Sequence, residues 1–136
     1  EFSVAVLKDN AEGHTVMPLE IIIEQQNDDE HNVVQVDDKL LAEQLSELAL
    51  EAFTALGARD YGRIDIRMDS EGVPHFLEAG LTPRFVEVGD NFQKTREQVF
   101  GVSNQQMLRT ITDLALSRPA IVIVEQPAPE PVASTA

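Results

Sequence analysis

The sequence predicts an α+β fold in which an antiparallel β-sheet packs against helices. Residues 61–68 alternate between apolar and charged side chains, which is typical of a strand buried on one face. The segment Asp-Ser-Glu-Gly at 69–72 indicates a turn, and residues 73–79 form the returning strand of a β-hairpin. Apolar residues recur at helical spacing just before this hairpin. With 136 residues, 43% of them hydrophobic, the chain is long enough for one domain with its own core.

The N-terminal part of the chain is expected to supply further strands. A turn signal at 9–13 contains Asp, Asn and Gly, and a polar, acidic loop occupies 26–31. Pro18 indicates a break or an edge position, because proline cannot donate to a strand ladder. The expected strands are residues 2–8, 15–17, 19–25 and, in a short final piece, 33–36.

A long helix is expected from Asp37 or Asp38 to about Leu56. Either aspartate can cap the helix N-terminus, and Gly57 ends the helix. One face carries an apolar stripe, which predicts that this face packs on the sheet. The stripe consists of Leu41, Leu45, Leu48, Ala49, Ala52 and Leu56.

Two shorter helices are expected near the C-terminus. The first covers residues 91–100 and ends at Gly101, and Ser103 with Gln106 forms a capping box for the second. The second helix has a buried stripe made of Met107, Leu108, Ile111, Leu114 and Ala115. Beyond Pro119, residues 120–124 can add an edge strand, and the Pro/Ala-rich remainder is typical of a disordered tail.

Composition argues against several classes of function. The formal net charge of −14 disfavours nucleic acid and anionic membranes as partners, because both are polyanions. The absence of cysteine excludes disulfides and thiol nucleophiles and is compatible with a cytoplasmic protein. The sequence has neither a membrane-spanning apolar run nor a secretory signal at its start. The oligomeric state is left open, a homo-oligomer included.

The predicted hairpin brings charged residues together on one face. Closing it symmetrically about its turn pairs Met68 with Val73, Asp65 with Phe76, and Arg63 with Glu78. Directly opposed residues share a face, so Arg63, Asp65 and Glu78 are expected to form one polar cluster. Two carboxylates suit Mg²⁺, and an adjacent arginine suits a phosphoryl oxygen. The alternative is a hairpin with one wet face and an ordinary Arg63–Glu78 ion pair.

Three separated stretches resemble the ATP-grasp ligases, in particular the D-alanine–D-alanine ligase branch. The stretch GRIDIRMDSEGVPHFLEAGLTP at 62–83 is similar to the family's metal-binding hairpin. The start EFSVAVL is similar to a family strand, and residues 92–116 resemble its closing pair of helices. The resemblance covers about residues 1–118. It implies the C-terminal half of an ATP-grasp fold there, with residues 119–136 as the edge strand and tail.

The resemblance implies ligation of a carboxylate to an amine at the expense of ATP, through an acyl phosphate, as in peptidoglycan precursor synthesis. Asp65 and Glu78 would ligate Mg²⁺, and Arg63 would be the catalytic residue that steadies the phosphoryl group. Glu1 would hold the ribose hydroxyls of the nucleotide, and Leu77 would pack against adenine. Core packing explains Leu77 equally well, and a terminal Glu1 can simply be mobile.

Several positions depart from the family pattern. Gly80 stands where the family has a third metal ligand, Arg84 where it has glycine, and Gly89 near its substrate-binding serine. The loop at 26–31 contains no lysine. The family also carries two domains before this part, so we expect preceding domains to be missing and the isolated chain to be inactive. The alternative is a degenerate, non-catalytic ATP-grasp domain that acts as a binding or scaffolding module.

Overall fold

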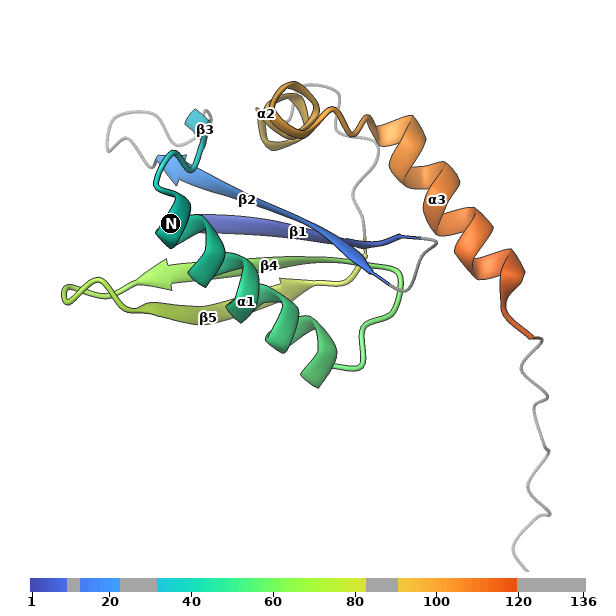
Figure 1. Cartoon of the computed structure of the whole chain (residues 1–136), viewed down its shortest axis with the longest axis horizontal. Coiled ribbons are helices and arrows are strands. Elements are labelled where there is room, and N and C mark those ends of the chain that lie inside the picture. Colours follow the sequence, from blue (N-terminus) through green and yellow to red (C-terminus); the bar gives the residue numbers. More distant parts are fainter. Residues whose placement is uncertain (10–12, 23–31, 83–90, 120–136) are drawn as a thin grey trace, which may run out of the picture.

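The computed structural model describes residues 1–9, 13–22, 32–82 and 91–119, with only the backbone at 91–93. Figure 1 shows one sheet, with helices on either side of it and at its end. The elements are β1 (Phe2–Lys8), β2 (His14–Ile22), β3 (Asn32–Gln35), α1 (Lys39–Ala55), β4 (Tyr61–Met68), β5 (Pro74–Gly80), α2 (Asn91–Phe100) and α3 (Asn104–Ser117).

Within the described residues the sheet has five strands in the order β3-β2-β1-β4-β5, and every neighbouring pair is antiparallel. This confirms the predicted α+β class. β1 lies in the centre, and its residues from Phe2 to Leu7 are all buried. A central strand is covered on both faces, which explains why β1 is a nearly continuous apolar run. The hairpin β4–β5 therefore pairs with the most deeply buried strand of the domain.

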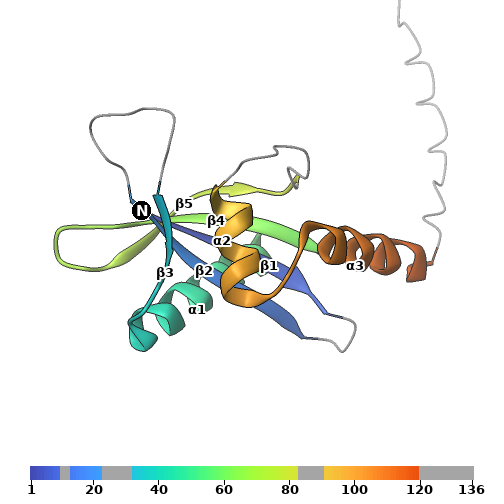
Figure 2. The same cartoon turned by 90° about the horizontal axis from the view of Figure 1, so that it is seen from above.

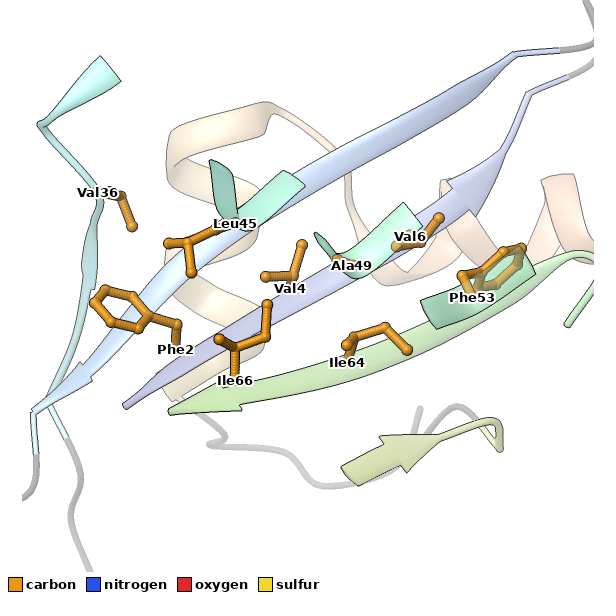
Figure 3. Packing of buried hydrophobic residues seen from close by; sticks show 9 residues of the cluster. All are labelled: Phe2, Val4, Val6, Val36, Leu45, Ala49, Phe53, Ile64 and Ile66. Carbon is orange, nitrogen blue, oxygen red and sulfur yellow. The ribbon is translucent and has the colours of Figure 1, made fainter. Parts of the chain in front are cut away.

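Helix α1 covers one face of the sheet. Its buried residues Leu45, Ala49 and Phe53 pack against apolar side chains of β1 and β4, and Figure 3 shows these side chains gathered between the helix and the strands. Asp38 caps the helix by accepting hydrogen bonds from the amides of Leu40 and Leu41, as expected. The predicted apolar stripe omitted Phe53 and wrongly included Leu56, which is 50% exposed because it lies at the helix end.

Helices α2 and α3 lie on the opposite face. Met107 of α3 is buried against Ala5, Leu7, Met17 and Leu19, which point away from α1. The boundaries of α2 and the capping box of Ser103 and Gln106 agree with the sequence prediction. Figures 1 and 2 show α3 running outward beyond the end of the sheet. Its predicted stripe is consequently buried only in part, and Leu108 remains 48% exposed.

Pro18 does not break β2, which runs without interruption from His14 to Ile22. The amide of Ile21 donates to the carbonyl of Glu1, so the amides of odd-numbered residues of β2 point toward β1. The nitrogen of Pro18 therefore points away from β1. On that side β3 extends only as far as Gln35, which lies opposite Leu19. Pro18 thus occupies an unpaired edge within a continuous strand.

The predicted strand at 120–124 and the tail lie outside the described residues. Among the helices of the described part, none is both long enough and apolar enough to cross a membrane.

Candidate functional site

The turn between β4 and β5 is organised by Asp69. Its Oδ1 accepts hydrogen bonds from the amides of Glu71 and Val73, each at 2.9 Å. Its amide donates to the carbonyl of Val73 at 3.0 Å, which closes the loop. Gly72 has φ of 82°, so the glycine expected at a left-handed turn position is confirmed. These bonds place Val73 inside the loop, one residue beyond the predicted turn.

The pairing of β4 with β5 differs from the symmetric hairpin that was predicted. Met68 lies opposite Pro74, and Ile66 lies opposite Phe76, because the loop is one residue longer. A bulge follows at Leu77 and shifts the register by one more residue, so Asp65 lies opposite Glu78. The predicted pairing of Asp65 with Phe76 was therefore wrong.

The two single-residue offsets together restore the alternation of faces. A shift of one residue turns side chains to the other face, and a shift of two returns them. Phe76 lies between the two offsets, so it shares a face with Ile66, toward α1. Glu78 lies beyond both and shares the face of Asp65. The expected grouping of Arg63, Asp65 and Glu78 is present, although the register that predicted it was incorrect.

Arg63 contacts both carboxylates of this group. Its Nη2 lies 2.9 Å from Oδ2 of Asp65 and 3.7 Å from Oε1 of Glu78. Its Nε donates to Oδ1 and Oδ2 of Asp65, at 3.1 and 3.2 Å. The side chain of Asp65 is 8% exposed, whereas that of Glu78 is 66% exposed. The carboxylate of Asp65 is therefore buried against the sheet, and that of Glu78 extends into solvent.

Ser3 of β1 also belongs to the site, although it was not among the residues predicted from the sequence. Its hydroxyl donates to Oδ1 of Asp65 at 2.6 Å, and Ser3 is 1% exposed. A polar residue inside the otherwise apolar run from Phe2 to Leu7 is a signal that could have revealed it, because a buried hydroxyl requires a hydrogen-bond partner. The identity of that partner depends on the pairing of β1 with β4.

The site contains two carboxylates and one guanidinium, so acidic groups outnumber basic ones. Burial lowers the pKa of Arg63, but attraction to Asp65, its hydrogen bond to Asp65, and attraction to Tyr61 and Glu78 outweigh this, so the pKa is raised. The guanidinium stays protonated, and it offsets one of the two carboxylates when both are ionised. The remaining negative charge favours a cation at this position.

Residues 1–113 match the sequence model of the family described as the D-ala D-ala ligase C-terminus. The chain belongs to this family. A D-alanine–D-alanine ligase from Nitrosococcus oceani is 35% identical over 74 residues, which cover 54% of this chain and 23% of that protein. One from Limosilactobacillus fermentum is 30% identical over 83 residues, 61% of this chain and 21% of that protein. The chain thus spans less than a quarter of the length of these two relatives.

Solved structures of the D-alanine–D-alanine ligases share the fold. The Bacillus anthracis ligase complexed with ATP superposes with a TM-score of 0.65 at 15% identity, covering 85% of this chain and 37% of that chain. The Coxiella burnetii ligase gives a TM-score of 0.65 at 21% identity, covering 85% of this chain and 31% of that one. The five-stranded sheet and its helices are thus the C-terminal part of an ATP-grasp fold, as the resemblance implied.

The donor set of this family member is compatible with Mg²⁺. Asp65 and Glu78 offer only oxygen atoms from adjacent strands, and Mg²⁺ usually takes one or two carboxylates and keeps several waters. Within the described residues, no cluster of three or more His, Cys, Asp or Glu side chains could hold a metal. An ion bound here would therefore have two protein carboxylates from the described residues, Asp65 and Glu78, and would share Asp65 with Arg63.

Gly80, which departs from the D-alanine–D-alanine ligase pattern, lies directly opposite Arg63. A Cβ atom at Gly80 would lie 3.8 Å from Cβ, Nε and Cζ of Arg63, an ordinary contact distance. The position thus has room for a side chain and supplies no side-chain oxygen. Arg84, Gly89 and the loop at 26–31 lie outside the described residues.

The two residues predicted to bind the nucleotide lie at the margin of this group. The carbonyl of Glu1 accepts from the amide of Ile21 at 2.7 Å, so the start of the chain is tied to β2. Leu77 is the bulge residue of β5 and is 50% exposed. Leu77 is next in sequence to Glu78, and Glu1 precedes Ser3 by two residues. Their roles toward a nucleotide stay predictions.

Proposed function

We propose that this domain forms the metal-binding and phosphoryl-stabilising side of the active site of an ATP-dependent carboxylate–amine ligase of the D-alanine–D-alanine type. One observation carries the proposal. Asp65 and Glu78 lie directly opposite each other, and the Arg63 guanidinium is within reach of both. The carboxylate oxygens suit Mg²⁺, and the neighbouring guanidinium of Arg63 suits a phosphate bound to that ion.

Each residue of the group has a distinct part in this function. Asp65 and Glu78 hold Mg²⁺, which when bound offsets the negative charge of the phosphates. Arg63 orients a phosphoryl oxygen and stabilises the charge that develops as the phosphoryl group moves to the carboxylate substrate. Asp65 in turn keeps Arg63 in place through a two-pronged hydrogen bond.

In the proposed site, a nucleotide and two small substrates bind beside the metal. Glu1 accepts hydrogen bonds from the ribose hydroxyls, and Leu77 covers one side of the adenine. The match to a ligase solved with ATP supports ATP as the nucleotide. The substrates are a small carboxylic acid and a small amine, with an acyl phosphate formed between the two steps. Preceding domains provide the other wall of the cleft, and the reaction takes place in the cytoplasm.

A second function is favoured by Gly80. The absence of an oxygen ligand at this position, together with the Arg63 guanidinium on Asp65, weakens the site as a metal centre. A degenerate ATP-grasp domain that serves as a binding or scaffolding module would tolerate both features. Such a module needs the fold but not the charge pattern.

The test is Mg²⁺-dependent ATP turnover by the full-length protein that contains this domain, measured with and without Asp65→Asn. We expect turnover to fall on the order of 100-fold or more, because Asp65→Asn weakens the hold on both Mg²⁺ and Arg63, whose positive charges stabilise the transition state. Asp113→Asn on α3 is the matched control, since this exposed aspartate lies outside the site. Turnover that survives Asp65→Asn, or that is absent in the unaltered protein, favours the scaffolding function instead.

A further inference from the structure

Ser3 is a polar residue in the buried part of β1, the central strand of the sheet. Phe2 and Val4 on either side of it belong to the core beneath α1, and Ser3 points to the opposite face. Ser3 is 1% exposed. A buried hydroxyl without a partner destabilises a fold, so a serine at this position has to satisfy its hydroxyl inside the sheet.

The partner of Ser3 is the buried carboxylate of the site. Ser3 lies directly opposite Asp65 in the β1–β4 ladder, and Asp65 lies directly opposite Glu78 in the β4–β5 ladder. The three side chains therefore form a row across three adjacent strands, with Asp65 in the middle. The Ser3 hydroxyl donates to Oδ1 at 2.6 Å, which is short, as expected for a donor to an ionised acceptor.

The contacts of Asp65 come from two sides. Ser3 holds Oδ1 from the β1 side, and Arg63 reaches Oδ2 through Nη2 at 2.9 Å. The Nε of Arg63 also contacts both oxygens. If the serine bond were removed, the carboxylate could turn to suit the guanidinium alone, and the direction of its remaining lone pairs would no longer be fixed.

We propose that Ser3 is a positioning residue that sets the orientation of the Asp65 carboxylate for a divalent cation shared with Glu78. This inference rests on the proposed function, since it assigns a partner to one of the two metal ligands. Hydrogen bonds that orient ligating side chains commonly change metal affinity 10- to 100-fold when they are removed. A merely structural serine would change stability and leave metal affinity unaltered.

The first experiment titrates the 136-residue chain with Mn²⁺ and follows free Mn²⁺ by electron paramagnetic resonance. The variants are Ser3→Ala, Ser3→Thr, Asp65→Asn and, as the matched control, Ser46→Ala. Ser46 also bears a bonded hydroxyl, which donates to the carbonyl of Ala42 on α1 and is remote from the site. Circular dichroism and the unfolding midpoint of each variant separate effects on folding from effects on binding.

We expect Ser3→Ala to weaken Mn²⁺ binding about 10- to 100-fold, and Ser3→Thr to restore most of the affinity because it returns a hydroxyl. Asp65→Asn should remove the binding, and Ser46→Ala should leave it unchanged. If Asp65→Asn removes binding but Ser3→Ala leaves it intact, the metal site stands and the role of Ser3 is refuted. If Asp65→Asn has no effect, or the unaltered chain binds no Mn²⁺, the proposed function fails and the role of Ser3 fails with it.

The second experiment needs no metal. The Arg63 Nε–H group contacts both oxygens of Asp65, so its resonance in a ¹⁵N–¹H correlation spectrum reports the orientation of the carboxylate. We expect this resonance to move in Ser3→Ala, to return toward its original position in Ser3→Thr, and to stay in place in Ser46→Ala. An Arg63 resonance that is unchanged in a folded Ser3→Ala protein would contradict the proposal.

Discussion

Gly62 and Gly80 lie on neighbouring strands, yet a side chain would meet different surroundings at the two positions. A Cβ atom at Gly62 would lie 2.9 Å from Cδ2 of Phe53, too close for any real contact. A Cβ atom at Gly80 would meet Arg63 at 3.8 Å and fit without adjustment. The first glycine allows α1 to pack closely on β4, whereas the second leaves an opening beside the charged group.

We predict opposite outcomes for substitutions at these two glycines. Gly62→Ala should lower the free energy of unfolding by about 1–3 kcal/mol, because it forces the ring of Phe53 away from the strand. Gly80→Asn should change the free energy of unfolding by less than about 1 kcal/mol. It should also tighten Mn²⁺ binding, because it adds an amide oxygen beside Asp65 and Arg63. Urea unfolding and Mn²⁺ titration measure the two effects.

The outcome at Gly80 decides more than stability. A folded Gly80→Asn protein with unchanged or weaker Mn²⁺ binding would show that the opening beside Arg63 is not part of a metal site. Gly80→Ala is the matched control, because it fills the same space without adding an oxygen.

At the scale of the element, the β4–β5 hairpin is stabilised from its tip by Asp69. Its carboxylate accepts amide hydrogen bonds from within the loop and lies 2.8 Å from Nε2 of His75. The backbone hydrogen bond from Val73 is the main cause of a lowered pKa at Asp69, followed by the hydrogen bond with His75. The loop therefore holds the ionised carboxylate, and this contact fixes the loop length that sets the register of the strands.

The lowered pKa predicts how the hairpin tip responds to pH. Because the folded-state pKa of Asp69 lies below the ordinary value of 3.8, its ionised form stabilises the loop above pH 3.8. This stabilisation is lost as the pH falls through the folded-state pKa. The amide resonances of Glu71 and Val73, followed during acid titration, should therefore shift below pH 3.8.

Asp69→Asn keeps a side-chain acceptor but removes the titrating group, so this variant should lack the transition at the hairpin tip. The midpoint in the unaltered chain is the decisive quantity. If the amide resonances of Glu71 and Val73 shift with a midpoint at or above pH 3.8, the contacts of the Asp69 carboxylate with these amides would be contradicted.

At the scale of the whole molecule, the candidate site is an open surface. The Glu78 side chain is 66% exposed, that of Arg63 is 36% exposed, and Leu77 is half exposed. Small-molecule sites usually bury 70–90% of the ligand surface. The described face of the domain is therefore too open to enclose a small ligand by itself. The chain also spans less than a quarter of the length of the Nitrosococcus oceani and Limosilactobacillus fermentum ligases.

We predict that the 136-residue chain by itself binds ATP weakly and has no ligase activity. Isothermal titration calorimetry with ATP and Mg²⁺ should give a dissociation constant of about 1 mM or higher. This corresponds to a binding free energy no more favourable than about −4 kcal/mol. A full-length protein containing the domain is the control and should bind more tightly. A micromolar affinity for the 136-residue chain would refute the prediction.

Local pattern was sufficient for most elements and insufficient for their pairing. The cap at Asp38, the glycine at 101 and the capping box at Ser103 are short-range signals, and the helices they delimit agree with the prediction. The hairpin register was predicted incorrectly, because neither the extra loop residue held by Asp69 nor the bulge at Leu77 has a distinctive sequence pattern. A continuous strand through Pro18 likewise depends on where β3 ends.

The sequence by itself determined that two strands with period-two alternation carry Arg63, Asp65 and Glu78, and that a family-specific pattern surrounds them. It also determined a strand at 2–8, whereas the central position of this strand, which explains its apolar run, came from the structure. Only the tertiary structure decided that the hydroxyl of Ser3 meets the carboxylate of Asp65, 62 residues farther along the chain. Such a contact follows from the pairing of β1 with β4, and no local spacing encodes which residues two distant strands place opposite each other.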